Sequence, residues 1–191
     1  MPDSINRIIK AARECFRQHG YNTANIAMIS RHAKISRVTI HKHFTNKEAL
    51  FRAVVSDYLD KTAMTIENYQ LSNQSFWPAT KALLREKCER VFEEVSNHLI
   101  KPDLAQAGEQ YCQDLIEQRR LQTIKAIADK AQQAVEANEL SLVKVSMTSL
   151  EFAQTLHQAA ENFLMSGSKS STEASFIRLL NVFVAATESK A

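Results

Sequence analysis

Basic and hydrogen-bonding side chains gather in one short stretch of the sequence, residues 25–44. Their helical spacing places most of them on the outer face of one short helix. Guanidinium, imidazole and ammonium groups donate hydrogen bonds to phosphate oxygens and base edges, and the major groove of DNA admits one α-helix. The residues expected on that outward face or at its flanks are Arg37, Val38, Thr39, His41, Lys42 and His43. This stretch predicts contact with double-stranded DNA.

Two short helices joined by a tight turn must hold these side chains. Ile29, Ile35 and Ile40 have the spacing that turns them inward, against each other and against a preceding helix. Lys34 lies in the turn, and Ser36 is placed to cap the second of the two helices. The pattern is that of a helix-turn-helix motif over residues 25–44.

Other residues with chemical potential give weaker signals. His41 and His43 are two positions apart, so they point to different sides of a helix and do not predict a metal site. His157 and Glu161 are one helical turn apart and could share a ligand, a metal or only a hydrogen bond, of which a hydrogen-bonded pair or a pocket lining is favoured. The sequence contains no Gly-rich phosphate loop, no zincin motif and no nucleophile with an evident His/Asp partner. We expect neither an enzyme nor a cofactor.

The charge of the chain is divided unevenly. Residues 1–55 carry ten Lys and Arg against three acidic residues, a net charge of +7, whereas residues 56–191 carry a net charge of −4. A basic segment attached to an acidic body is expected when only one end of a protein meets a polyanion.

The composition favours an all-α fold. Gly and Pro each occur only three times in 191 residues, too rarely for the many turns of a β-rich chain. Apolar residues recur at helical spacing from Ile5 onward, and we expect about nine helices. Among them are a short helix starting at Pro102 and a longer one over about residues 111–138. The sequence predicts a three-helix DNA-binding domain over residues 1–55 and a second helical domain over residues 56–191.

Capping boxes mark the starts of three of the expected helices. They are Thr45 with Glu48, Thr148 with Glu151 and Ser170 with Glu173, whose spacing lets a hydroxyl and a carboxylate satisfy each other's backbone N–H groups. We therefore expect a long fourth helix after Thr45 and two further helices near residues 148–166 and 171–188.

The cysteines and the start of the chain bear on its compartment. Cys15, Cys88 and Cys112 are odd in number and lack zinc-type spacing, which favours reduced thiols. The first residues lack the basic and apolar regions of a signal peptide, and no stretch is apolar for the roughly 20 residues that span a bilayer. We expect a cytoplasmic protein that does not enter a membrane.

The last two expected helices carry apolar residues around most of their circumference. A helix of this kind is either central to a core or paired with another subunit. We expect these two helices to pair with their symmetry mates in a homodimer. The residues assigned to the dimer interface are Leu156, Phe163, Phe176, Leu180 and Phe183.

The segment 9–51 resembles the N-terminal domain of TetR-family transcription regulators. The residues that carry the resemblance are Ala11-Ala12, Phe16, Gly20-Tyr21, Ile29-Ser30, Ala33 to Ser36, Thr39-Ile40, His43-Phe44 and Asn46 to Leu50. They cover about the first quarter of the chain without a gap. The remainder is similar to the family only in its length and helical organisation.

The resemblance implies individual roles. Arg37 would donate to a guanine and Val38 would touch a thymine methyl group. The remaining implied contacts, mainly to phosphates, are those of Asn25, which would also cap its helix, Thr39, His41, Lys42, His43 and Lys47.

Three residues depart from the family pattern. Lys34 replaces the usual Gly, so either the turn is not left-handed or the lysine bears strain. Val38 stands where a small residue is frequent, which opposes close backbone approach to DNA. His41 replaces the usual Tyr, which predicts a weak dependence of DNA binding on pH.

The resemblance also implies partners. A dimer would place its two recognition helices in successive major grooves of a palindromic operator, most often as a repressor. A small-molecule effector, bound in a cavity of the second domain, would favour a dimer geometry that releases DNA. The residues assigned to this pocket are Phe92, Tyr111, His157 and Glu161. The alternatives are a helical scaffold or adaptor that uses the helix-turn-helix to contact protein and, with less support, an enzyme.

Overall fold

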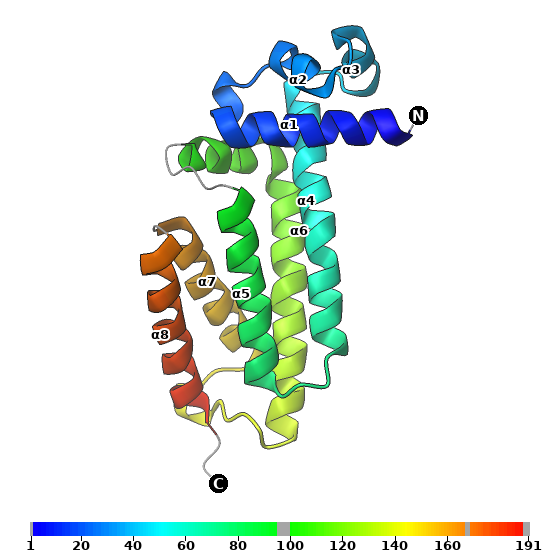
Figure 1. The fold of residues 1–191 in the computed structure, drawn as a ribbon. Helices are drawn as coiled ribbons and strands as arrows, with labels where there is room; N and C mark the ends of the chain where they lie inside the picture. Colours follow the sequence, from blue (N-terminus) through cyan, green and yellow to red (C-terminus); the bar gives the residue numbers. More distant parts are fainter. Residues whose placement is uncertain (1, 95–99, 167–168, 189–191) are drawn as a thin grey trace. The chain divides into compact units, whose positions relative to one another are not determined.

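The computed structural model describes residues 2–94, 100–166 and 169–188, without the side chains of residues 2, 88–94, 164–166 and 169–173. It is all-α, as predicted, with eight α-helices and one 3₁₀ helix in the described residues (Figure 1). The elements are α1 Pro2–Thr23, α2 Ile26–Ala33, α3 Arg37–His43, α4 Lys47–Leu71, α5 Phe76–Glu94, α6 Lys101–Glu136, η1 Val143–Val145, α7 Ser149–Ser166 and α8 Lys169–Thr187. No described helix is both long enough and apolar enough to cross a membrane.

The chain folds into two compact units. Unit 1 comprises Met1–Lys61 and Glu93–Gln118, and unit 2 comprises Thr62–Phe92 and Arg119–Ala191. Both α4 and α6 contribute residues to each unit, so the chain passes between the units inside helices. The sequence prediction divides the chain by function at residue 55, and that functional division stays a prediction.

Unit 1 is built on the apolar stripe of α1. Ile8, Ala12 and Phe16 are buried, as their spacing predicts, and they share one core with the buried Ile29 and Ile40. This core also contains residues of α4 and of the first half of α6, which are Leu50, Phe51, Val54, Ala107 and Cys112. The three-helix head therefore obtains part of its core from a segment more than fifty residues further along the chain.

One prediction about α6 is wrong. The sequence predicts a short helix at Pro102 and a separate one from about residue 111, but α6 is a single helix of 36 residues, Lys101–Glu136. Pro102 lies in the first turn, where its missing N–H has no helical partner to lose. A glycine such as Gly108 destabilises a helix by only about 1 kcal/mol. The burial of Ala107 and Cys112 on the same helix offsets this cost.

The three predicted capping boxes differ in outcome, and the side chains of Ser170 and Glu173 lie outside the described residues. At the start of α7, Thr148 N donates to Glu151 Oε2 over 2.8 Å and Glu151 N donates to Thr148 Oγ1 over 3.2 Å, which confirms the box. At the start of α4 the prediction is wrong, because Asn46 Oδ1 accepts from Ala49 N over 2.8 Å. The cap is one residue later than Thr45, so Glu48 lies at a different position of the first turn.

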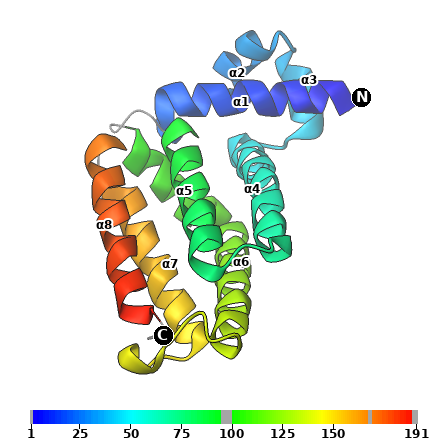
Figure 2. The same cartoon turned by 60° about the horizontal axis from the view of Figure 1, so that its bottom comes forward.

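Unit 2 is a bundle in which α5 is central. Its Thr80 hydroxyl lies 2.9 Å from Tyr69 Oη of α4, and Trp77 Nε1 donates to Thr187 Oγ1 of α8 over 3.1 Å. Figure 2 shows α5 in front of α6, with α7 and α8 beside it. The buried core of the bundle includes Phe76, Leu83, Leu84, Ile127, Phe152 and Ala153.

The burial of residues on α7 and α8 bears on the dimer interface, which stays a prediction. Leu156, Phe176 and Leu180, assigned above to the dimer interface, are at most 5% exposed within the core of their own unit. Their surface is already covered by the same chain, so a second subunit would have little left to bury. Phe163 and Phe183 are partly buried against this core. The exposed large apolar residues of the described α7 and α8 are instead Leu150, Ile177 and Val182.

Candidate nucleic-acid interface

The two helices of the predicted helix-turn-helix begin at side-chain caps. Asn25 Oδ1 accepts from Met28 N over 3.0 Å at the start of α2, and Ser36 Oγ accepts from Thr39 N over 3.1 Å at the start of α3. Both caps are as expected from the sequence, and each satisfies an N–H that the helix leaves open. The caps set where α3 begins, and therefore which of its residues turn inward.

The turn between α2 and α3 is left-handed. Lys34 has φ 54° and ψ 42°, and its N–H donates to Arg31 O over 3.3 Å. Ile35 N donates to Ser30 O over 3.2 Å, and Ser30 Oγ returns a hydrogen bond to Ile35 O over 2.7 Å. These bonds close the C-terminus of α2. The sequence left open whether this turn is left-handed. The structure shows that it is, with Lys34 in the left-handed position.

A Lys34→Gly substitution is expected to stabilise the protein by about 0.5–1 kcal/mol. A left-handed backbone costs an L-residue about 1–2 kcal/mol, which glycine avoids. Part of this gain is offset because glycine loses more conformational entropy on folding. Unfolding in urea measures the change. Lys42→Gly is the control, because Lys42 lies within α3 and should lose about 1 kcal/mol. A destabilised Lys34→Gly variant would contradict the strain assigned to this turn.

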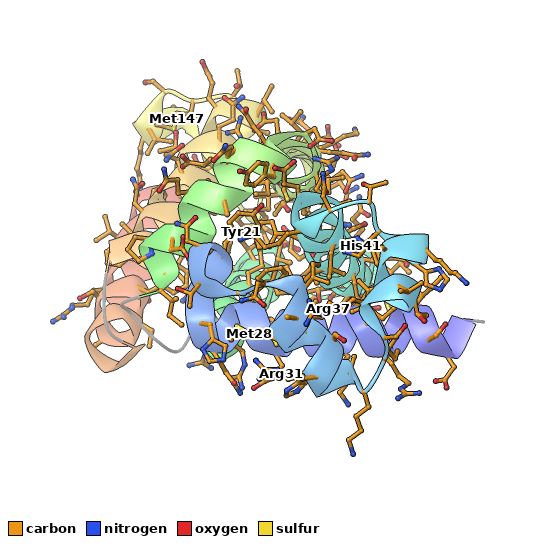
Figure 3. The ribbon with its side chains drawn as sticks, turned by 90° about the horizontal axis from the view of Figure 1, so that it is seen from above. Tyr21, Met28, Arg31, Arg37, His41 and Met147 are labelled. Carbon is orange, nitrogen blue, oxygen red and sulfur yellow. The ribbon has the colours of Figure 1, made fainter. Side chains whose placement is uncertain are left out.

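The outward face of α3 is exposed and basic. Ile40 is fully buried, whereas Arg37, Val38, His41, Lys42 and His43 are exposed, Val38 to 67%. Figure 3 looks onto α2 and α3, with Arg37 and His41 on α3 and Met28 and Arg31 on α2. Thr39 is half-buried, and its Oγ1 lies 2.9 Å from Ser36 Oγ. The predicted DNA-contacting residues of α3 therefore lie on one short helix, anchored from beneath by Ile40.

Lys47 lies at the start of α4, beside the end of α1. Its Nζ donates to Tyr21 O over 2.8 Å and lies 4.2 Å from the centre of the Tyr21 ring. The ammonium therefore fixes the first turn of α4 to the segment that follows Gly20. Its predicted role as a phosphate contact stays a prediction, and it has a structural role besides.

Gly20 ends the regular part of α1 and meets the start of α6. Its φ of 76° and ψ of 175° interrupt the helix, in a region that only glycine adopts readily. A Cβ there would lie 2.6 Å from Ile100 Cγ2 and closer still to Asp103 Oδ2. A glycine at the end of a helix commonly forms a left-handed cap, whereas the observed ψ of Gly20 is extended. The reason is the adjacent α6, whose Asp103 Oδ2 accepts from Asn22 N over 3.2 Å.

Within unit 1, a polar contact also joins α4 to α6. Arg52 Nη1 and Nη2 donate to the two carboxylate oxygens of Asp114, each over 2.7 Å. Hydrogen bonding to Arg52 lowers the pKa of Asp114 to about 2. Nearby, burial raises the pKa of the Cys112 thiol to about 11. A thiol with so high a pKa is a poor nucleophile, which favours a packing role for Cys112.

The residues assigned to an effector pocket do not form one set. His157 Nδ1 lies 3.6 Å from Glu161 Oε2 in unit 2. Tyr111 belongs to unit 1, where its ring centre lies 5.1 Å from that of Tyr21. Phe92 lies on α5, and its side chain is outside the described residues. Of the assigned residues whose side chains are described, His157 and Glu161 lie together in one unit.

Unit 2 contains a small cavity that the sequence did not reveal. Its volume is about 10 Å³, and it lies where α4, α5 and α6 face one another. The lining residues are Thr62, Thr65, Ile66, Leu83, Lys87, Arg119 and Thr123. Next to it is an open groove of about 160 Å³ that shares Thr65 and Leu83 with the cavity and is also lined by Glu86.

The sequence profile of bacterial regulatory proteins of the tetR family matches residues 8–54, which span α1 to the first turns of α4. This segment, about a quarter of the chain, is therefore similar to the DNA-binding domain of that family. The family is described as regulatory proteins, in agreement with the sequence prediction.

Curated relatives match over part of the chain. YuxN, an uncharacterised HTH-type transcriptional regulator of Bacillus subtilis, is 31% identical over 93 residues, 49% of this chain and 32% of YuxN. The regulator UidR of Escherichia coli is 41% identical over 26% of this chain and 25% of UidR. The repressor ComR of Escherichia coli is 40% identical over 27% of this chain and 25% of ComR. Each match spans a third or less of the relative's own length.

Solved structures share the fold over nearly the whole chain. Reduced NemR of Escherichia coli has a TM-score of 0.74 at 13% identity, covering 98% of this chain and 99% of NemR. SmeT, the repressor of the Stenotrophomonas maltophilia efflux pump SmeDEF, has a TM-score of 0.71 at 14% identity, covering 96% of this chain and 90% of SmeT. At these identities the likeness establishes the TetR fold alone.

Two features of this chain are not among the residues predicted from its sequence. Arg31 and His32 are exposed basic residues in the last turn of α2, beside the recognition helix. Their position at the end of a short basic helix was the available signal. Lys87 and Arg119 gave no such signal, because they lie 32 positions apart on different helices and meet only in the cavity.

Proposed function

We propose that this protein is a dimeric transcriptional repressor of the TetR family that binds a palindromic operator and is released by a small-molecule effector. The observation that carries the proposal is the exposed basic face of α3, anchored by the buried Ile40. A short, well-anchored helix with outward donors suits major-groove recognition. The similar protein ComR is named as a transcriptional repressor. In this proposal the protein acts in the bacterial cytoplasm, where its operator would be.

In this proposal the functional division lies near residue 55, with the DNA-binding domain before it and the effector-sensing and dimerisation domain after it. Arg37 and Val38 contact base edges. The residues that contact mainly the DNA backbone are Asn25, Thr39, His41, Lys42, His43 and Lys47. The exposed Arg31 adds a positive charge at the end of α2, where it would strengthen binding to any DNA sequence.

The dimer surface is proposed on the outward faces of α7 and α8. Leu150, Ile177 and Val182 are 51%, 43% and 66% exposed, an apolar exposure that a partner would cover. The partly buried Phe163 and Phe183 would lie at the edge of this surface. An effector would bind in unit 2. SmeT, which is similar to this chain in fold, has been solved as a complex with triclosan.

Selection of bound sequences from a random DNA pool tests this proposal. We expect two half-sites of inverted sequence, about 10 base pairs apart or a multiple of that, from a two-fold symmetric dimer. Affinity for random duplex DNA should fall steeply as salt rises, because phosphate contacts release counterions. Half-site spacing and the salt slope are the two measurements.

Val182→Asp separates dimerisation from folding. It places a charge on an exposed position of α8, so the variant should keep its melting temperature, become monomeric and lose affinity for paired half-sites. Asn181→Asp is the control, since Asn181 is exposed on the same helix. No enriched motif, together with salt-insensitive DNA binding, would favour the scaffold alternative instead.

A further inference from the structure

The guanidinium of Arg7 lies against the turn between α2 and α3. Arg7 is on α1, and its Nη2 donates to the carbonyl of Ala33, the last residue of α2, over 3.0 Å. The last carbonyls of a helix have no partner within the helix and carry partial negative charge, so a cation there is favourable. Figures 1 and 3 both show the first half of α1 beside α3. A residue of α1 is therefore fixed close to where α3 begins.

The hydrogen bond to Ala33 uses only part of the Arg7 side chain. A guanidinium has five N–H donors in a planar fork, and Ala33 O accepts from one of its nitrogens. Within the described residues, Arg7 is exposed and takes part in no ion pair, and Asp3, one turn before it on α1, is exposed as well. The other donors can therefore bind a group outside the chain, and their fork matches the oxygens of a phosphate.

The sequence around this turn carries charge of one sign. Residues 15–47 contain no Asp or Glu. Arg31, His32 and Lys34, next to Ala33 in the chain, are all exposed. Glu14, which precedes this stretch, already accepts hydrogen bonds from two side chains of α1. A basic surface of this kind fits a polyanion.

The place of Ala33 in the chain puts Arg7 at the border of the groove that α3 would enter. A helix with its side chains is about 10–12 Å across and the major groove is about 12 Å wide, so the helix fills the space between the two phosphate backbones. The chain that leads into the helix therefore passes close to one of them. Ala33 precedes the Ser36 cap by three residues, which span at most about 11 Å. Phosphates on that side of the groove are consequently close to Arg7.

Lys47 is the counterpart of Arg7 beyond the other end of α3. It begins α4, four residues after His43 ends α3, and its Nζ donates to Tyr21 O over 2.8 Å. Both cations are held by a backbone carbonyl, which fixes their positions and leaves their charge in place. One cation adjoins the chain before α3 and the other the chain after it, as contacts to the two backbones of one groove require.

We propose that Arg7 is a further DNA contact of this protein, whose guanidinium binds a phosphate beside the start of α3 while it holds Ala33 O. This rests on the proposed function and adds a residue that precedes the family profile, which begins at residue 8. Because the guanidinium is fixed before DNA arrives, little side-chain entropy is lost on binding. A phosphate held there also fixes the position of Arg37 along the duplex, since phosphate contacts set the register in which bases are read.

Fluorescence anisotropy of the full chain with a labelled random duplex, over a series of salt concentrations, tests the proposal. For each head in contact with DNA, Arg7→Ala should weaken binding about three- to tenfold near 0.1 M salt and reduce the slope of log K against log salt by about 0.9. Arg7→Lys keeps the charge and should keep the slope. If Arg7→Ala fails to fold, Arg7→Gln supplies the same test, because it removes the charge but retains an N–H donor.

Two control variants separate a DNA contact from a purely structural role. Ser30→Ala removes the hydrogen bond from Ser30 Oγ to Ile35 O in the same turn without a change of charge, so the salt slope should stay that of the parent protein. Lys61→Ala removes one positive charge from unit 1 at a distance of about 21 Å along α4 from Lys47, and it should also leave the slope unchanged. Melting temperatures of the proteins without DNA show how far each variant disturbs the fold.

Three results would overturn the proposal. They are an unchanged salt slope in both Arg7→Ala and Arg7→Gln, an equal reduction of the slope in Ser30→Ala, and a reduction in Arg7→Lys as large as in Arg7→Ala. If the parent protein binds DNA with a steep salt dependence, any of these results removes the role of Arg7 and leaves the proposed function intact. If the parent protein binds DNA without salt dependence, the proposed function fails and the role of Arg7 fails with it.

Discussion

Replacing Gly20 with alanine is expected to destabilise the protein by about 2–5 kcal/mol. The backbone at Gly20 has a positive φ and an extended ψ, which costs other residues about 1–3 kcal/mol. The added Cβ would also overlap Ile100 and Asp103 at the start of α6, and overpacking of this kind costs about 1–3 kcal/mol more. Unfolding in urea, followed by circular dichroism, measures the loss.

Gly108→Ala is the matched control for this prediction. Gly108 lies inside α6, and a Cβ there would approach only Ile116 Cδ1, at 3.3 Å. A helical backbone favours alanine over glycine by about 1 kcal/mol, so this variant should be as stable as the parent protein or more so. Equal losses in the Gly20 and Gly108 variants would refute the special role given to Gly20. Because native proteins are stable by only about 5–15 kcal/mol, Gly20→Ala should also reduce the yield of folded protein.

Replacing Arg37 with alanine is expected to cost about 1–3 kcal/mol of operator binding, a five- to 150-fold loss of affinity. The loss should be confined to one position of each half-site, where the variant no longer prefers a particular base. Arg37 is exposed on α3 and its backbone is held by the Ser36 cap and the buried Ile40, so the fold should be unaffected. Affinities for operators carrying each of the four bases at that position measure the effect.

Lys42→Ala is the control for Arg37→Ala. Lys42 is exposed on the same helix, and its loss should weaken binding to operator and random DNA alike, with a shallower dependence on salt. Lys47 is less suitable, because its ammonium also holds the Tyr21 carbonyl. If Arg37→Ala weakens operator and random DNA to the same extent, Arg37 contacts phosphate and not a base.

Local sequence patterns predict the head of this protein well. The spacing of Ile8, Ile29 and Ile40 identifies residues that are all fully buried, because each lies on a helix whose inward face is apolar and whose outward face is polar. Asn25 and Ser36 are likewise found as caps, since a cap depends on residues within one helical turn. These are local rules, and they hold where the neighbours are close in sequence.

The second half of the chain shows where such rules stop. Leu180 lies on a helix that is apolar around much of its circumference, so its pattern does not reveal that it points into the core of its own chain. Tyr111 was grouped with His157 by residue type, although they belong to different units. Lys87 and Arg119 lie on different helices, and only the fold shows that both line one cavity. Each of these facts depends on long-range packing.

The composition of unit 1 bears on how proteins of this kind can be recombined. Ala107 and Cys112, from the first half of α6, are buried among the residues of α1 to α4, although the family profile ends at residue 54. A head cut after residue 55 would leave an uncovered apolar surface. Exchange of sensor domains between relatives, by evolution or by design, therefore has to carry the matching start of α6 along with the head. The inheritable module is discontinuous in sequence, and a splice that transfers only the segment matched by the family profile would separate that segment from part of its own core.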